Sequence, residues 1–140
     1  MPYKFLDHSS DALVEVRHTD MRGALTDAAL STIDIMLDRD AIQNKTVRHF
    51  DIKDDAVHRL LYQWLDDIIF VTLADNFAIK EITVDEFDDS DHIIMKARAF
   101  GEPLDLSKHR FRVEVKAPTY HEMKINCDKN GIVLQFLLDL

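Results

Sequence analysis

The sequence predicts an α+β fold, a two-layer sandwich in which two main helices cover one side of a mixed or antiparallel sheet. Residues 21–37 and Val57 to Ile69 repeat apolar side chains at helical spacing. After the second helix, apolar and polar residues alternate in segments that are separated by short turns such as Asn130-Gly131. A run of strands that follows the helices, instead of alternating with them, favours α+β over a wound parallel sheet.

The N-terminal third is expected to contain two strands and one helix. A polar turn separates the strands, and either Thr19 or Asp20 can cap the helix. The apolar residues of the helix form one face. These elements are expected at residues 3–7, 12–17 and 21–37.

The rest of the chain is expected to contain the clearest helix and most of the strands. Asp54 is predicted to cap this helix, whose apolar residues recur at i, i+3, i+4 and i+7. Residues 101–109 are expected to form a polar connection. The strands are expected at 45–52, 77–87, 93–99, 123–127 and 132–138.

Length and composition predict a single domain that spans residues 1–140. No apolar run approaches the roughly 20 residues of a membrane-spanning helix, and the N-terminus lacks the apolar stretch of a signal peptide. Cys127 is the one cysteine, which excludes an internal disulfide and a cysteine-based zinc cluster. We therefore expect a cytoplasmic protein with no membrane partner.

The formal net charge of −9 argues against direct binding to nucleic acid, which calls for a basic patch. An acidic protein can still dock on a basic protein. The sequence also lacks a glycine-rich phosphate loop, a nucleophile elbow and a His-Glu-x-x-His motif. These absences disfavour a self-sufficient NTPase or hydrolase.

The last residues are the first candidate for a site. An apolar strand, Ile132 to Leu138, is followed only by Asp139 and Leu140. A firmly packed strand would fix the Asp139 side chain and the α-carboxylate of Leu140, and two fixed carboxylates can bind a hard cation. The alternative is a core strand that ends there without a site, which this pattern favours when taken by itself.

A second candidate is the polar turn between the first two strands, His8-Ser9-Ser10-Asp11. As a ligand loop, it would offer the hard oxygens of Asp11, with His8 as a pairing side chain. As an ordinary Asx or Ser turn, it would use Asp11 to accept from nearby backbone amides. The local pattern favours the turn.

The third candidate is Lys116, which precedes a stretch containing Tyr120 and His121. Its ammonium could balance a carboxylate cluster or contact a phosphate or a partner. The alternative is a solvated lysine near a strand end. Tyr120 and His121 could orient such a site, or they could be surface residues of an edge strand.

Five motifs lie along the chain: His8-x-x-Asp11, Leu60-Leu61-x-x-Trp64-Leu65, Gly101-Glu102 with His109, Val115-Lys116-Ala117-x-Thr119-Tyr120-His121, and Leu138-Asp139-Leu140. Together they resemble the archease family, and the similarity runs from Tyr3 to Leu140. Two departures from the family pattern leave the candidate ligands unchanged: Ser9-Ser10 replaces Thr-Ala, and Pro118 replaces a valine. Because proline lacks an N–H, Pro118 indicates a bulge or an edge position.

The resemblance implies a strand–helix–strand–strand unit with an insertion, in a protein that is not itself an enzyme. It implies an accessory protein of an RtcB-type RNA ligase, which joins tRNA halves in tRNA splicing. Such a protein promotes guanylylation and multiple turnover of the ligase, and can broaden its nucleotide use.

The resemblance also implies a divalent cation, most readily Ca²⁺, with Mg²⁺ or Mn²⁺ as alternatives. Its ligands fall on Asp11, Asp139 and the Leu140 carboxylate. The required lysine falls on Lys116, and His8 and His121 are expected to assist activation.

Two other functions remain open from the residues. A metal-dependent enzyme acting on a small phosphorylated substrate could use the same carboxylates with Lys116, and would have a deep pocket beside Asp11. A chaperone-like interaction module would need no metal and would expose an apolar patch.

Overall fold

The computed structural model describes residues 3–6 and 10–140. Within these residues, two main helices and seven strands follow one another in the predicted order, one short 3₁₀ helix is additional, and the α+β class is confirmed. The elements are β1 (Tyr3–Leu6), β2 (Asp11–His18), α1 (Met21–Met36), η1 (Arg39–Ala41), β3 (Thr46–Asp54), α2 (Val57–Leu73), β4 (Phe77–Asp88), β5 (Ile93–Pro103), β6 (Ala117–Asp128) and β7 (Gly131–Asp139).

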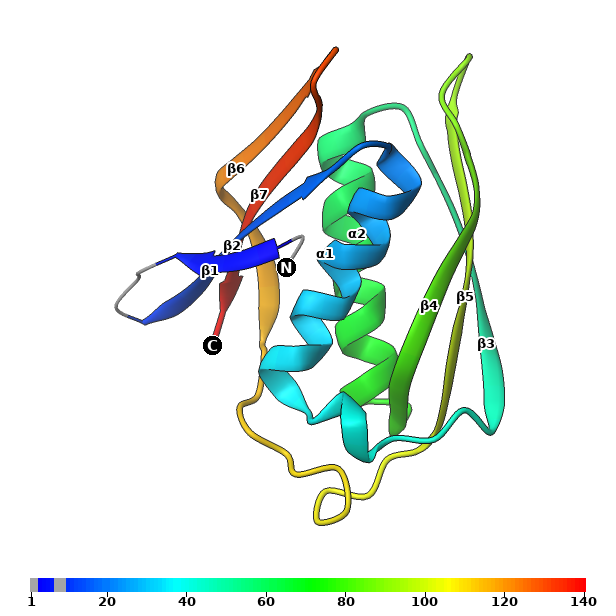
Figure 1. Ribbon diagram of the computed structural model, residues 1–140, viewed down its shortest axis with the longest axis vertical. Coiled ribbons are helices and arrows are strands. Elements are labelled where there is room, and N and C mark those ends of the chain that lie inside the picture. The colour runs from blue at the N-terminus through cyan, green and yellow to red at the C-terminus, as the bar shows by residue number, and fades with distance from the viewer. Residues whose placement is uncertain (1–2, 7–9) are drawn as a thin grey trace.

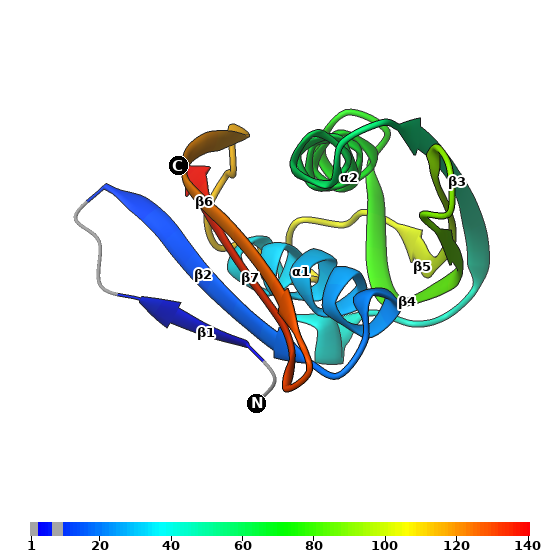
Figure 2. The same cartoon turned by 90° about the horizontal axis from the view of Figure 1, so that it is seen from above.

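The strands form two sheets, and this corrects the expected single sheet with helices on one side. One sheet has the order β1-β2-β7-β6, and the other has the order β3-β5-β4. The strand pairs given by the described residues are all antiparallel. Figures 1 and 2 show α1 and α2 between the two sheets, with β1, β2, β6 and β7 on one side and β3, β4 and β5 on the other.

Helix α1 can lie between two sheets because it is buried around more than one face. In α1, even Ser31 and Thr32 are fully buried, and both hydroxyls donate to the carbonyl oxygen of Ala28, at 2.8 and 3.0 Å. Those bonds remove the cost of burying the hydroxyls. A helix that is buried on most sides needs a layer of structure on each side of it. No helix in the described part of the chain is long and apolar enough to cross a membrane.

The two helices begin differently. At α1, Asp20 is the cap, since its carboxylate accepts from the Gly23 N–H at 2.7 Å. The prediction that Asp54 caps α2 is wrong, because the cap position is Ala56, which makes no side-chain capping bond. Asp54 instead accepts from the N–H groups of Asp55 and Ala56, at 2.7 and 3.1 Å, and forms a turn just before the helix.

Trp64 joins the layers at the centre of the molecule. Its side chain is fully buried, and its indole N–H donates to the Leu25 carbonyl oxygen of α1 at 2.8 Å. Its ring meets that of Phe50 on β3 edge to face, with centroids 5.2 Å apart. One side chain of α2 therefore contacts both the other helix and a strand of the β3-β5-β4 sheet.

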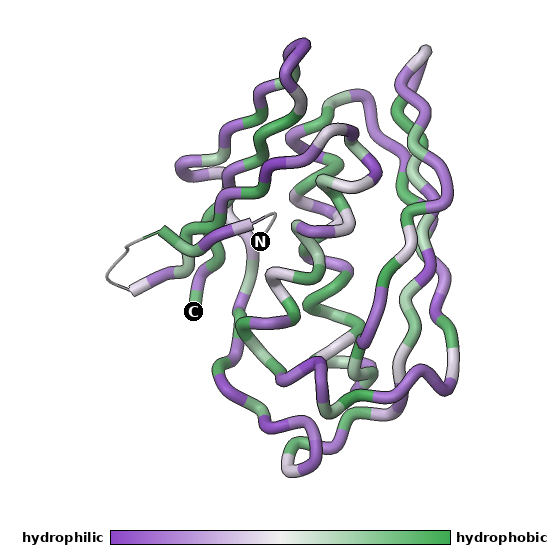
Figure 3. The backbone as a smooth tube through the Cα atoms, in the orientation of Figure 1, coloured by the Kyte–Doolittle hydropathy of each residue, from purple (hydrophilic) through white to green (hydrophobic). Residues whose placement is uncertain are grey.

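The strands keep the predicted alternation of apolar and polar residues, which Figure 3 shows along their length. The last strand, β7, lies inside its sheet between β2 and β6. Leu134, Phe136 and Leu138 are fully buried on its helix-facing side. The prediction of a core strand at the end of the sequence is confirmed.

Candidate functional site

Asp11 and Asp139 lie opposite each other on two neighbouring strands. β2 and β7 run antiparallel, with Asp11 paired to Asp139. Residues paired in this way have Cβ atoms about 4.5–5.5 Å apart and share one face of the sheet. Asp139 is exposed and Asp11 is partly buried. The fold thus brings together two predicted metal ligands from opposite ends of the chain.

Lys116 lies beside this carboxylate pair. On the other side of β7, Ala117 of β6 is paired with Asp139, and the Lys116 N–H donates to the Asp139 carbonyl oxygen at 2.8 Å. The Lys116 side chain is exposed, whereas Leu140 is partly buried and packs against the core. Backbone contacts on both sides of β7 therefore fix Asp139 relative to Asp11 and Lys116.

The carboxylate pair suits a hard cation. Like charges that are directly opposite in a sheet repel one another, and carboxylate oxygens are the ligands that hard divalent cations prefer. Over residues 3–6 and 10–140, no three His, Cys, Asp or Glu side chains form a metal-binding group. The third protein ligand expected from the family resemblance is the α-carboxylate of Leu140, and His8, expected to assist activation, lies outside the described residues.

β6 is an edge strand that contains a bulge. Pro118 lies on this edge strand, which confirms the edge position expected from its missing N–H. Further along β6, the register with β7 breaks between Thr119 and Lys124. His121 lies within that break, is exposed, and donates its N–H to the Thr119 hydroxyl oxygen at 3.0 Å. His121 is thus outside the regularly paired segment next to Lys116.

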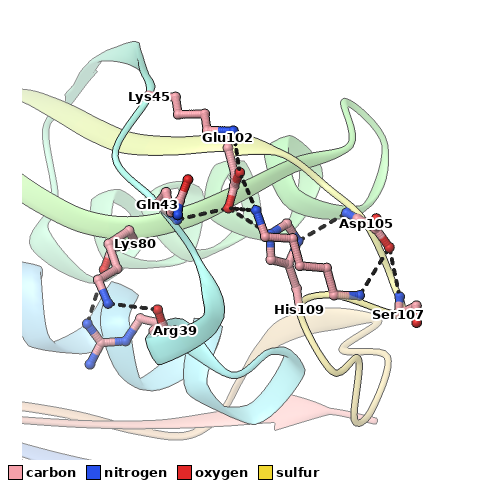
Figure 4. A network of polar contacts seen from close by, with 9 residues as sticks. Arg39, Gln43, Lys45, Lys80, Glu102, Asp105, Ser107 and His109 are labelled. Carbon is pink, nitrogen blue, oxygen red and sulfur yellow. Dashed lines mark hydrogen bonds and ion pairs between the residues drawn. The ribbon is translucent and has the colours of Figure 1, made fainter.

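The buried carboxylate of Glu102, shown in Figure 4, is a polar centre that the sequence did not reveal. Its residue is 3 % exposed. The Lys108 ammonium lies 2.9 and 3.0 Å from its two oxygens, the buried His109 ring lies at 3.0 Å, and the Gln43 N–H donates at 2.8 Å. These hydrogen bonds, those from Lys108 and His109 first, hold the pKa of Glu102 far below its ordinary value.

The hydrogen bonds of His109 determine which of its two ring nitrogens bears the proton. The Asp105 N–H donates to Nδ1 at 3.0 Å, so Nδ1 carries no proton. Nε2 then bears the proton and donates it to Glu102. With both nitrogens engaged, this ring cannot bind a metal, and His109 serves to position the chain around it.

Glu102 lies on a strand, which corrects the polar connection predicted at 101–109. β5 continues to Pro103, beyond the predicted end at residue 99. Gly101 makes this possible, because a Cβ there would lie 1.8 Å from the Ala78 carbonyl oxygen on β4. The Gly-Glu pair and His109 were present among the family motifs, but they carry no periodicity that predicts a strand or a buried ion pair.

The segment that leads to Lys116 is fastened to the end of α1. The Asp38 N–H donates to the His109 carbonyl oxygen at 3.0 Å, and the Arg112 N–H donates to the Met36 carbonyl oxygen at 2.8 Å. The Arg112 guanidinium also donates to the Asp34 carbonyl oxygen at 2.8 Å. Residues 104–116 thus form an ordered loop, and Glu102 with His109 holds its beginning.

Glu102 should make the protein sensitive to acid. Its folded-state pKa lies below its unfolded value of 4.5, so its contribution to stability is complete above about pH 4.5 and is lost as the pH falls further. We expect Glu102→Gln to lower the urea midpoint at pH 7, and to lower it by less at pH 3, where part of the contribution of the ionised carboxylate is already lost. Circular dichroism measured during urea unfolding at several pH values checks this.

The matched control is Glu81→Gln, which changes an exposed carboxylate on β4. It should leave the midpoint almost unchanged at both pH values. If the difference in urea midpoint between Glu102→Gln and the natural protein is the same at pH 7 and at pH 3, the ionised, hydrogen-bonded state of Glu102 is contradicted.

The N-terminal strand is held by a second polar cluster. The hydroxyl of Tyr3 donates to the Asp34 carboxylate, and Arg39 donates to the same carboxylate through Nε at 2.6 Å. Burial, followed by the contact with Asp34, raises the pKa of Tyr3 to about 12. This cluster fastens β1 to α1, and β1 in turn pairs with β2, the strand that begins at Asp11.

Fold and site define a small α+β protein of two antiparallel sheets around two helices, with a carboxylate pair at the end of a central strand. The sequence model of the Archease protein family (MTH1598/TM1083) matches residues 3–140. The chain therefore belongs to the archease family.

Relatives of known sequence and structure agree with this assignment. The chain is similar to Protein archease from Methanopyrus kandleri, with 29% identity over 140 residues and 100% of each chain covered. It is also similar to Protein archease from Sulfurisphaera tokodaii, with 28% identity over 138 residues, 99% of this chain and 98% of that one.

Two solved structures share the fold. The solution structure of Methanobacterium thermoautotrophicum protein 1598 has a TM-score of 0.83 and 28% identity, with 99% of each chain covered. The crystal structure of an archease, possible chaperone, from Thermotoga maritima has a TM-score of 0.63 and 15% identity, with 98% of this chain and 96% of that one covered. At that identity, the second likeness concerns the fold alone.

Proposed function

We propose that this protein is an accessory protein that activates an RtcB-type RNA ligase of tRNA splicing. It promotes guanylylation of the ligase and multiple turnover, and it is not itself the catalyst. Family membership supports this function, and the observation that carries it is the pairing of Asp11 with Asp139 next to Lys116.

A divalent cation, with Ca²⁺ as the first choice and Mg²⁺ or Mn²⁺ as alternatives, completes this proposal. Asp11, Asp139 and the α-carboxylate of Leu140 would hold it, and water would fill the remaining positions. The bound ion would supply positive charge between carboxylates that otherwise repel. The exposure of Asp139 supports this assignment, because a partner or water can reach its oxygens.

Lys116 is proposed to act on the ligase directly. Its side chain is exposed, and its backbone lies next to the carboxylate pair, where its N–H donates to the Asp139 carbonyl oxygen. It could contact a ligase carboxylate or a phosphate of the bound nucleotide. His8 and His121 keep their proposed supporting roles, and the net charge of −9 suits a basic ligase surface.

The direct test is a ligation assay in which the ligase is present at a much lower concentration than its RNA substrate. With this protein added, the product should exceed the amount of ligase many-fold, and without it the reaction should stop near one turnover. Equal product in both reactions would reject the proposed function. Lys116→Ala should remove the effect, and Lys124→Ala, an exposed lysine further along β6, should not.

One observation favours a second candidate, a chaperone-like interaction module. The ordered loop 104–116 exposes three apolar side chains: Leu106, Phe111 and Val113 are 58%, 37% and 41% exposed. A contiguous apolar patch on a surface commonly marks a protein contact, and this loop is a segment of the chain that could supply one. Full stimulation of the ligase in the presence of a chelator would favour this candidate over a metal-dependent activator.

The α-carboxylate of Leu140 can be tested separately. We expect two added residues after Leu140 to weaken Ca²⁺ binding at least about tenfold, because the carboxylate becomes an amide and a ligand charge is lost. Isothermal titration calorimetry with Ca²⁺ measures this. Extending the chain at its N-terminus by the same two residues is the control, and an unchanged affinity after the C-terminal extension would remove Leu140 from the ligand set.

A further inference from the structure

A groove of about 680 Å³ lies between the start of α2 and the strand β6. Asp11, Lys116 and Asp139 are not among its lining residues. Its volume is within the range of about 300–1,000 Å³ that is typical of small-molecule sites. The lining residues are Val57, His58, Arg59, Tyr120, Met123 and Ile125.

The bulge in β6 builds one wall of this groove. Between Thr119 and Lys124 the strand leaves its register with β7, and Glu122 adopts a left-handed φ of 57°. Within the bulge, the ring of Tyr120 stacks on that of Tyr62 of α2, with centroids 4.6 Å apart and planes at 17°. The ring is still half exposed, so stacking on α2 does not cover it fully.

The floor and the rim of the groove differ in chemistry. Val57, Met123 and Ile125 are partly buried and pack against the hydrophobic core, so they offer an apolar floor. At the rim, Arg59 donates through Nε to Asp54 at 3.0 Å, which holds its guanidinium in place. A guanidinium bears further donors on its two terminal nitrogens.

The first turn of α2 adds to this rim. Val57, His58 and Arg59 are the first three residues of the helix and all line the groove. No side chain caps this helix in the described chain. The rings of His58 and Tyr120 meet edge to face, with centroids 5.9 Å apart. Aromatic rings, an apolar floor and nearby cationic or N–H donors therefore lie in one groove.

We infer that this groove binds a free mononucleotide. The base would lie on the apolar floor against Tyr120, where stacking favours any flat base. The phosphate would accept from Arg59 and from the first turn of α2, a combination suited to an anion. A polyanion such as RNA is disfavoured, because the chain carries a net charge of −9.

The test is a titration of the full chain with GMP, followed by NMR, with a chelator present so that no metal takes part. Saturable changes in chemical shift should appear at the backbone amides of Val57, His58, Met123 and Ile125, and they should give a dissociation constant below about 1 mM. Guanosine and inorganic phosphate, titrated separately, should each bind at least about tenfold more weakly, because each provides only half of the contacts.

Three variants and one matched control decide the site. Arg59→Gln and Tyr120→Ala should each weaken GMP binding at least about tenfold, and Tyr120→Phe, which keeps the ring, should restore it. Phe70→Ala changes an exposed aromatic residue elsewhere on α2 and should leave binding unchanged. Absence of saturation with GMP, or equal binding by Tyr120→Phe and Tyr120→Ala, would overturn the inference.

A short single-stranded RNA titrated in parallel tests the choice of a free nucleotide. It should bind no more tightly than GMP, and binding at least about tenfold tighter would overturn the assignment to a mononucleotide. The inference does not depend on the proposed activation of a ligase, since the assay contains neither ligase nor metal.

Discussion

Asp139→Ala is expected to abolish stimulation of multiple-turnover ligation and to leave the fold intact. The change removes one of two carboxylates that face each other across β2 and β7, and with it the proposed cation site. Because Asp139 is exposed, its side chain contributes little to packing. Product formed per ligase molecule measures the loss, and circular dichroism with a thermal melt checks the fold.

Two further variants make this result specific. Asp139→Asn keeps the size of the side chain and removes its charge, so it should lose the stimulation of ligation almost as completely as Asp139→Ala. Asp51→Ala removes an exposed carboxylate from β3 on the other sheet, and it should stimulate normally. Full stimulation by a folded Asp139→Ala protein would reject the carboxylate pair as the functional site.

The largest effect on stability is expected for Trp64→Ala, which should lower the free energy of unfolding by about 3–5 kcal/mol. The change leaves a cavity between α1, α2 and β3 and removes the hydrogen bond to the Leu25 carbonyl oxygen. Urea unfolding must be followed by far-UV circular dichroism, because Trp64 is the single tryptophan. A loss under about 1 kcal/mol would contradict its role as the link between layers.

A graded series separates packing from hydrogen bonding at this position. Trp64→Phe keeps an aromatic ring near Phe50 but leaves the buried Leu25 carbonyl oxygen without its indole partner, so it should cost less than Trp64→Ala and still more than about 1 kcal/mol. Phe70→Ala, a truncation at an exposed position of the same helix, should stay within about 0.5 kcal/mol of the natural protein.

Local sequence patterns predicted the elements better than their assembly. The repeat from Val57 to Ile69 specifies a helix, and the segment from Asp128 to Gly131 specifies a hairpin turn, each within a few residues. The two-sheet arrangement was missed because it depends on which faces of α1 are covered, and buried hydroxyls such as that of Ser31 look polar in a sequence. The early part of β6 was missed because an edge strand with exposed residues lacks a strong alternation.

The candidate site was likewise predicted only in part from the sequence. Asp11, Lys116 and Asp139 were proposed as members of one site through the family resemblance, and their closeness follows from strand pairing across the whole chain. The bonds between Glu102 and His109 were not foreseen, because burying a carboxylate is feasible only with donors that other segments supply. No sequence pattern places two such segments side by side.

The pairing of β2 with β7 has a consequence for folding. The β3-β5-β4 sheet is built from strands of the middle of the chain, whereas β2 and β7 come from its two ends. Pairing between distant segments closes a large loop and is slow relative to local pairing. We therefore expect Asp11 and Asp139 to meet late, so that a partly folded chain lacks the carboxylate pair. The proposed activation of a ligase would then require a completely folded chain.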